Sequence, residues 1–501
     1  MTSLWLDHYT PVAADEFVPG VNYDTVVVGA GMTGLATALL LARAGQRVAV
    51  LEARHVGAVT TGNTTAKLSL LQGATMSNIL KRHSLDIAKA YVSGNREGQQ
   101  WLVRYCGERG IAIEQRDAFS YAGGAIGKDT VDAEYDAARQ AGLAVTLETD
   151  LELPYTTQGA VKLAGQYQFD PMDILASLAI DFREHGGVLH ENVRVQGVST
   201  NSEGGLNSGP LRNVQTTAGD VLTTNVVLAT GTPILDRGGY FAALEPSRSY
   251  ALAFQVPGEI PQGMYLSVDR PSRSLRTAST GGSTSLLVGG NGHVVGREPS
   301  ERGSVEDLRR WTERHFPGAE LTHSWSAQDY RPLDLLPYVG PILPGQEHIF
   351  VATGYNKWGM TNAIAAALTL SGRILGGHMR WADELAHRPL PPATLGNGAS
   401  LNAKAGAQMV SDWLRTAMNK DEATTPAEGE GVVVREGVHP VGISTVDGQT
   451  RRVSAVCPHM HGILSWNDAE QSWDCPLHGS RFTCAGELLE GPATRNLTRP
   501  E

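Results

Sequence analysis

The chain has 501 residues, of which 41% are hydrophobic and 19% are charged, and this globular balance excludes disorder throughout. At about 100–200 residues per domain, the length predicts two to four domains. The formal net charge is −11. An acidic surface repels phosphate backbones, so nucleic acid is not an expected partner.

The four cysteines, Cys106, Cys457, Cys475 and Cys484, are too few for a disulfide framework. Sparse cysteine is typical of a reducing compartment, so we expect a cytoplasmic protein. The first residues, MTSLWLDHYTPVAADEF, lack the basic and apolar regions of a signal peptide. The apolar run at 35–42 is too short to span a bilayer, so no membrane span is expected.

A dinucleotide fingerprint begins the first domain. Residues 23–28 (YDTVVV) form a β-branched run typical of a buried parallel strand, and residues 35–44 then predict a helix. Between them, Gly29, Gly31 and Gly34 permit a tight turn, close approach to a pyrophosphate and packing of helix on strand. Glu52 ends the next strand, 47–51, where an acid can bind a ribose diol. The alternative is a glycine-rich turn that binds nothing.

The rest of the chain divides by composition. Further helices and strands are expected at 173–185, 187–198, 225–229 and 349–352, followed by an alanine-rich helix up to 376. Proline, glycine, serine and glutamate dominate 386–429, which predicts a linker with one helix near 407–418. Residues 430–501 have short strands and turns. The other glycine-rich run, 289–296, has the wrong spacing for a second fingerprint, so a flavin would be reduced directly by an organic substrate.

A second motif lies near the end of the chain. Cys457-Pro-His459 and Cys475-Pro-Leu-His478 supply two thiolates and two imidazoles, the ligand set of a Rieske [2Fe–2S] centre. A Cys2His2 zinc site is the competing interpretation. The surrounding WNDAEQSWDCPLHGSRF and LLEGPA resemble Rieske domains and favour the cluster.

Together these motifs resemble the D-amino-acid-oxidase/glycine-oxidase superfamily of FAD enzymes, with an appended Rieske domain. The resemblance rests on the fingerprint, TTGNTTAK at 60–67, NVVLATGTP at 225–233, WSAQDYRPLDLLPYVGP at 325–341 and ATGYNKWGMT at 352–361. It implies an α/β fold, in which a doubly wound, Rossmann-like FAD-binding domain is interleaved with an antiparallel-sheet substrate domain, plus a small all-β Rieske domain. The implied FAD-dependent oxidoreductase spans 1–385, with FAD-binding parts at about 22–90, 160–235 and 325–382 and substrate-domain parts at about 91–159 and 236–324; the Rieske domain spans 430–501.

The resemblance also assigns cofactor-binding residues. Thr64, Thr65 and Lys67 would lie along the flavin, Val195 would meet the adenine, and Thr230 and Gly231 would pass the adenosine. Gly354, Lys357, Gly359 and Met360 would precede a helix whose N-terminus faces the flavin pyrimidine, where it stabilises the negative charge of the reduced ring. The alternative for both lysines is a solvated surface position.

The implied function is that of a dehydrogenase that oxidises a C–N bond of a small amine or amino acid. Its electrons would pass from reduced FAD through the cluster to an external acceptor, and an oligomer is possible. Tyr250, Lys357 and Trp358 are the candidate catalytic residues, with Tyr330 and Arg331 on the substrate side. The alternatives are an electron-transfer flavoprotein between protein partners and a degenerate flavoprotein. A Rieske oxygenase, which needs mononuclear iron, is not favoured, because the flavin fold occupies the catalytic portion of the chain.

This Rieske site departs from the high-potential pattern. Gly462 and Leu477 stand where those domains have a second cysteine pair, so no disulfide joins the cluster loops. Ser480 can donate to cluster sulfur, whereas Phe482 replaces a tyrosine. Fewer donors predict a potential within the Rieske range of about −150 to +300 mV, but below its top.

Overall fold

The computed structural model describes residues 1–201, 211–280, 282–388, 425–437 and 439–500. The helix predicted near 407–418 lies outside these residues. Within the described part, no helix is both long and apolar enough to cross a membrane.

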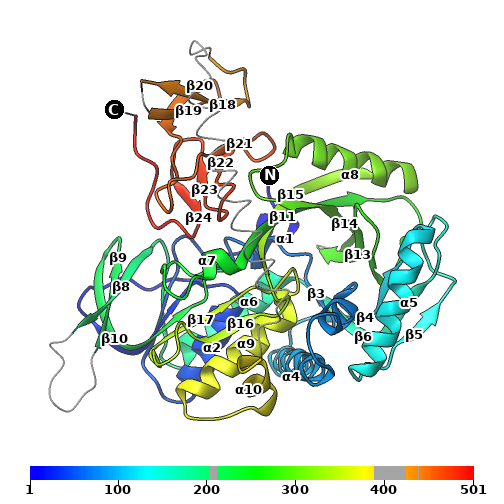
Figure 1. The fold of residues 1–501 in the computed structure, drawn as a ribbon, viewed down its shortest axis with the longest axis horizontal. Coiled ribbons are helices and arrows are strands. Elements are labelled where there is room, and N and C mark those ends of the chain that lie inside the picture. Colours follow the sequence, from blue (N-terminus) through cyan, green and yellow to red (C-terminus); the bar gives the residue numbers. More distant parts are fainter. Residues whose placement is uncertain (202–210, 281, 389–424, 438, 501) are drawn as a thin grey trace.

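The fingerprint residues belong to an eight-stranded sheet. Its central strand, β1 (Asn22–Val28), pairs in parallel with β2 (Val48–Leu51) on one side and β10 (Gly219–Leu228) on the other. The sheet continues with β7 (Val188–His190), β8 (Val195–Asn201), β9 (Leu211–Thr216), β16 (Tyr338–Pro341) and β17 (Ile349–Thr353). Helix α2 (Met32–Arg43) packs against α6 (Pro171–Glu184) and α9 (Gly359–Ile374). These helices share one core on one face of the sheet, and the arrangement is the expected mixed α/β, Rossmann-like one (Figure 1).

A nine-stranded sheet forms the second layer. Its order is β15 (Glu320–Pro332), β11 (Leu244–Gln255), β14 (Ser283–Val294), β13 (Arg273–Thr280), β12 (Met264–Ser267), β4 (Ile113–Tyr121), β6 (Ala160–Phe169) and β3 (Lys67–Leu68), with β5 (Thr146–Glu148) beside β6. Strands β6 and β15 were expected in FAD-binding parts of the chain. They belong instead to this sheet, because β6 pairs with β4 and β15 pairs with β11.

Helices cover the edges and faces of the two sheets. Helix α8 (Glu301–His315) packs on one face of the nine-stranded sheet, where Leu308 joins the core of β11 and β14. The remaining helices are α1 (Leu4–Asp7), η1 (Thr61–Asn63), α3 (Thr75–Leu80), α4 (Leu85–Arg109), α5 (Ala125–Gln140), α7 (Tyr240–Ala243) and α10 (Arg380–Ala386).

The C-terminal residues form a separate all-β lobe, which we call the Rieske lobe (residues 425–500). It contains a three-stranded sheet, β18 (Gly431–Glu436), β19 (His439–Val446) and β20 (Gln449–Ser454), and a four-stranded sheet, β21 (Ser465–Asn467), β22 (Ser472–Asp474), β23 (Arg481–Thr483) and β24 (Leu488–Glu490). Trp473 and Phe482 fill its core. Figure 1 shows the lobe beside β11, β15 and α7.

Candidate functional site

A cavity of about 950 Å³ lies between the two large sheets. It begins at the carboxyl ends of β1 and β2 and extends to β11, β13 and β14. The carboxyl edge of a doubly wound sheet is the usual place for a nucleotide, and here the cavity continues beyond that edge onto the antiparallel sheet. Two different ligands therefore have room: a nucleotide along the first sheet and a smaller molecule over the second.

The fingerprint glycines form a cradle that only glycine allows. Gly29 has φ 107°, and a Cβ built on it would lie 2.6 Å from the Ala229 carbonyl oxygen. A Cβ on Gly34 would lie 1.9 Å from the Gly29 carbonyl oxygen, so helix α2 packs directly on the turn. Gly31 borders the cavity beside Thr61. The bare backbone fits a pyrophosphate at the N-terminus of α2.

The polar groups at this end suit an adenosine. The Glu52 carboxylate is buried and accepts hydrogen bonds from the Ala30 and Arg54 amides, each at 2.9 Å. Burial raises the pKa of Glu52, against the effect of these hydrogen bonds. Val195, Thr230 and Gly231 line the same end of the cavity. Their assignment to FAD stays a prediction, and their positions fit it.

A strained loop borders the middle of the cavity. Asn356 and Lys357 have φ values of 49° and 71°, a left-handed conformation that costs energy in residues other than glycine. The Asp329 carboxylate supports this loop, because it accepts hydrogen bonds from the amides of Lys357 and Tyr330. Burial raises the pKa of Asp329 to about 6. Sequence reasoning did not identify this role, since Asp329 lies 28 residues from Lys357.

Helix α9 begins where the strained loop ends. Trp358, Gly359 and Met360 border the cavity, which places the helix N-terminus there as expected for a flavin site. Gly354 lies behind the lining and packs against Leu244 and Pro332. The Lys357 ammonium is exposed toward the cavity and donates to the Ser249 hydroxyl at 2.6 Å.

Lys67 is buried beside the opposite wall of the cavity, so its interpretation as a surface lysine is wrong. Its ammonium donates to the Tyr265 carbonyl at 2.8 Å and to the Ser274 hydroxyl at 2.7 Å. Burial, and then the nearby Arg276 charge, lower the pKa of Lys67 well below its ordinary value. Thr64 and Thr65 line the cavity next to it.

The orientation of Tyr250 differs from the prediction of a catalytic role. The ladder places its side chain on the same face of β11 as Arg248, and it packs there with Leu308 of α8. Its hydroxyl is 3.2 Å from His293 Nε2. Tyr250 borders the cavity but directs its ring to the other face of the sheet, because side chains alternate along a strand. Ser249 presents its hydroxyl on the cavity side instead.

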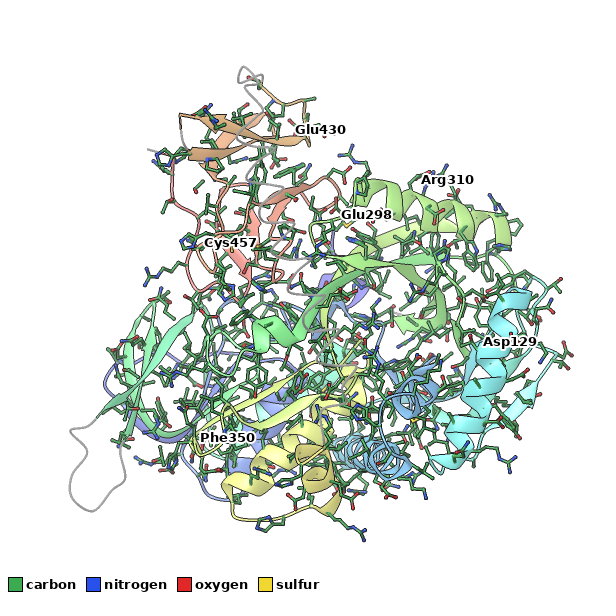
Figure 2. The ribbon with its side chains drawn as sticks, in the orientation of Figure 1. Asp129, Glu298, Arg310, Phe350, Glu430 and Cys457 are labelled. Atoms are coloured by element: carbon green, nitrogen blue, oxygen red, sulfur yellow. The ribbon has the colours of Figure 1, made fainter. Side chains whose placement is uncertain are left out.

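The four predicted cluster ligands come together in the Rieske lobe, where Figure 2 labels Cys457. The Cys457 and Cys475 thiols are buried and hydrogen-bonded to each other; this contact lowers the pKa of Cys457 and raises that of Cys475. The imidazole rings of His459 and His478 lie 5.0 Å apart. His478 Nδ1 is buried without a hydrogen-bond partner, and burial lowers the pKa of this imidazole to about 4. Neutral imidazoles and paired thiols are the donors that a Rieske cluster requires.

The ligand atoms are not arranged around one point. A tetrahedral zinc ion would hold its four ligand atoms within about 4 Å of one another. Among the described residues, only the group of Asp7, His8 and the half-buried His323 has three or more such atoms within 4.8 Å of one another. The thiols form one pair and the imidazoles another, which favours a two-iron cluster over zinc.

The groups around the ligands agree with a site that lacks a disulfide. A Cβ on Gly462 would lie 2.7 Å from the Leu477 side chain, so these two positions make a close apolar contact. The Ser480 hydroxyl is buried, accepts from the Ala493 amide at 3.0 Å and bonds to the Cys457 thiol. The predicted donor therefore lies beside one of the two thiols that would hold the cluster.

The imidazole edges face the segment between β10 and β11, at the start of the part predicted to be the substrate domain. His459 Nε2 lies 2.7 Å from the Asp236 carboxylate, and the Phe241 ring packs edge-on against His478 at a centroid distance of 5.4 Å. A carboxylate on the outer nitrogen holds a histidine ligand in orientation and raises its basicity.

Replacing Asp236 with asparagine is expected to raise the reduction potential of the cluster by tens of millivolts. The carboxylate beside His459 disfavours an added electron, and a tenfold change in a one-electron equilibrium is about 59 mV. A redox titration followed by EPR measures the shift. Asp220→Asn, which removes an equal charge from an exposed side chain bonded to Asn213, is the control. Equal reduction potentials in Asp236→Asn and Asp220→Asn would contradict an effect of the Asp236–His459 contact on the cluster.

Comparisons with known proteins agree with both parts of this geometry. The family of FAD dependent oxidoreductases (DAO) matches residues 24–373, and the Rieske [2Fe-2S] domain matches residues 415–501. The Bacillus subtilis (strain 168) protein YhfW, described as a Rieske 2Fe-2S iron-sulfur protein, is 30% identical over 95% of this chain and 92% of its own.

Solved structures share the fold of the larger part. Glycine oxidase from Geobacillus kaustophilus has a TM-score of 0.60 at 20% identity, covering 72% of this chain and 96% of its own. L-proline dehydrogenase from P. horikoshii has a TM-score of 0.59 at 18% identity, covering 76% and 99%. FAD and a Rieske cluster are thus the cofactors of this chain, as the sequence predicts. The chain belongs to the family of FAD dependent oxidoreductases and carries a C-terminal Rieske [2Fe-2S] domain.

Proposed function

We propose that this oxidoreductase oxidises a C–N bond of a small amine or amino acid and passes the electrons through its Rieske site to an external acceptor. The observation that best supports this function is that the cavity extends from the nucleotide cradle onto β11, β13 and β14. A flavoprotein that only relays electrons needs the cradle but not this extension of the cavity over the second sheet, which we call the chamber. FAD bound there supplies acceptance of a hydride, and a Rieske cluster supplies one-electron transfer.

The chamber offers groups that suit an amine or amino acid. Lys357 and Arg331 line it, and their positive charges can hold a substrate carboxylate. The Ser249 and Ser274 hydroxyls face it from two strands and can orient a polar substrate. Trp358 borders the same space and can exclude water from the reacting carbon. The glycine oxidase and L-proline dehydrogenase that share this fold act on amino acids by name, which supports the substrate class.

The test is anaerobic mixing of the purified protein with a panel of small amines and amino acids, followed by visible spectroscopy and EPR. We expect one compound class to bleach the flavin and a reduced-Rieske EPR signal to follow. In the cluster-free variant Cys475→Ala, the same compounds should still bleach the flavin, but no EPR signal should appear. If dithionite reduces both centres and no amine does, C–N oxidation is wrong. The electron-transfer flavoprotein would then be the better description.

A further inference from the structure

We infer that electrons reach the Rieske lobe within a single chain, by crossing the paired strands β11 and β15. The inference rests on the proposed electron relay and adds its route. It also assigns Gln328 and Tyr330 as positioning residues between the cavity and the loop that holds two cluster ligands.

Strands β11 and β15 form a wall with two different faces. Ser247 pairs with Asp329 and Ser249 pairs with Ala327, and all four residues line the cavity. The pair between them, Arg248 and Gln328, points the other way, because side chains alternate along each strand. On that outer face both side chains bond to the Rieske lobe. One layer of sheet therefore separates the flavin chamber from the cluster loops.

The side chains of Gln328 and Tyr330 lie on this outer face and link it to the nucleotide end of the cavity. Gln328 Nε2 donates to the Gly479 carbonyl and to the Tyr330 hydroxyl, each at 2.8 Å, and Gly479 directly follows the ligand His478. Tyr330 borders the cavity, and a Cβ built on Gly231 would lie 3.5 Å from its ring. These contacts join the nucleotide end of the cavity to the ligand loop without passing through solvent.

The ligand loop is in tight contact with β11 and with the turn that follows β14. A Cβ on Gly296 would lie 3.0 Å from the Pro476 nitrogen, and one on Gly479 would lie 2.7 Å from the Pro246 side chain. The Arg297 guanidinium also donates to the Pro476 carbonyl at 3.0 Å. Side chains at either glycine would separate the surfaces, so this is a fitted contact and not a loose encounter.

A buried ion network fixes the lobe in this position; we call it the latch (Arg248, Glu470, Arg481, Glu490). Arg248, only 2% exposed, binds both carboxylate oxygens of Glu470 at 3.0 Å. Arg481 contacts the same carboxylate and binds Glu490 at 2.6 Å. Glu490 also borders the cavity. The Arg248–Glu470 contact exists only while the lobe is docked, and removing either partner would leave the other charge buried and incompletely paired.

The electron count is compatible with this route. Oxidation of the C–N bond to C=N removes a hydride from carbon and a proton from nitrogen, and so releases two electrons. A [2Fe–2S] cluster takes one electron at a time, so each turnover needs two crossings of the wall. A one-electron acceptor outside the chain receives each electron, and the protons pass to solvent.

The first test uses flash photoreduction of the bound flavin, which needs no amine substrate. We expect cluster reduction to follow with a first-order rate that is unchanged on tenfold dilution of the holoenzyme. A rate that falls with dilution would show transfer between chains and overturn the inference. Because no substrate is involved, this result is separate from the amine panel.

The second test measures the latch. A protease site is inserted within residues 389–424 of the full chain, the holoenzyme is cleaved, and size-exclusion chromatography shows whether the two parts stay together. We expect co-elution of the wild type at micromolar concentration. Arg248→Met and, on the other side, Glu470→Gln should weaken association by roughly a hundredfold or more, because each leaves a buried partner incompletely paired.

Two checks make the latch test decisive. Retained flavin and iron show that each variant is folded. Because Arg248 lies in β11 and Glu470 in the Rieske lobe, the test still works if one of the two variants fails to fold. Arg302→Ala removes an exposed contact to Asp468 at the edge of the interface and is expected to change association less than threefold. Separation of the cleaved wild-type parts, or equal behaviour of latch and edge variants, would overturn a fixed lobe.

Discussion

Replacing Cys475 with alanine should remove the iron–sulfur chromophore completely and leave the flavin in place. The thiol is buried in pair with Cys457. Of the other two cysteines, Cys106 packs in the core of the larger part and Cys484 contacts Arg451. The FAD cradle belongs to the eight-stranded sheet, outside the Rieske lobe, so the conformation of its glycines does not depend on the lobe. Iron analysis, visible spectra and EPR of the reduced protein measure the loss.

Cys484→Ala is the matched control for this variant. Cys484 lies in the same lobe, is only partly buried, and contacts Arg451 at 3.7 Å and none of the predicted ligands. We expect it to keep the full iron content and EPR signal. A wild-type protein that contains one zinc and no iron, or a Cys475→Ala protein that keeps its cluster, would contradict the ligand assignment.

Gly34→Ala is expected to abolish stoichiometric FAD binding. Its new Cβ would lie 1.9 Å from the Gly29 carbonyl oxygen, and either α2 or the phosphate-binding turn must then move. Overpacking of this kind costs about 1–3 kcal/mol, and concentrated on the binding turn it weakens FAD by about tenfold to a hundredfold. The flavin-to-protein ratio after purification and a fluorescence titration with FAD measure the change.

The comparison variant is Gly107→Ala in α4. No heavy atom lies within 4 Å of the Cβ that this substitution adds, and alanine favours a helix over glycine by about 0.5–1 kcal/mol. It should bind FAD as the wild type does. The iron content of the Rieske lobe reports whether the Gly34→Ala chain remains folded in its C-terminal part. Full FAD occupancy in Gly34→Ala would show that the cradle does not determine nucleotide binding.

Local sequence patterns were sufficient for the cradle and the cluster. The β-branched run of β1, the three glycines and the strand that ends before Glu52 all follow from near neighbours in the chain. The predicted ligands, from Cys457 to His478, likewise follow from short spacings. The family resemblance added the second sheet and the flavin loop, and it is confirmed by the match over residues 24–373.

Long-range contacts account for what the sequence did not predict. The face on which Tyr250 points depends on the register of β11 with β15, which no local pattern encodes. The Asp236–His459 contact joins residues 223 positions apart, and Arg248 meets Glu470 across 222 positions. Lysine and arginine are usually exposed, so composition alone gave no reason to expect Lys67 or Arg248 in the interior.

The covered imidazole edges of the Rieske lobe bear on how easily electrons could be lost to unintended acceptors in solution. The His459 side chain is only 6% exposed, because Asp236 and Phe241, from the segment between β10 and β11, lie over the two rings. Small diffusing oxidants and foreign reductants thus lose access to the metal centre by this edge. In the proposed relay, this covered edge insulates the charge that leaves the cavity from the surrounding water.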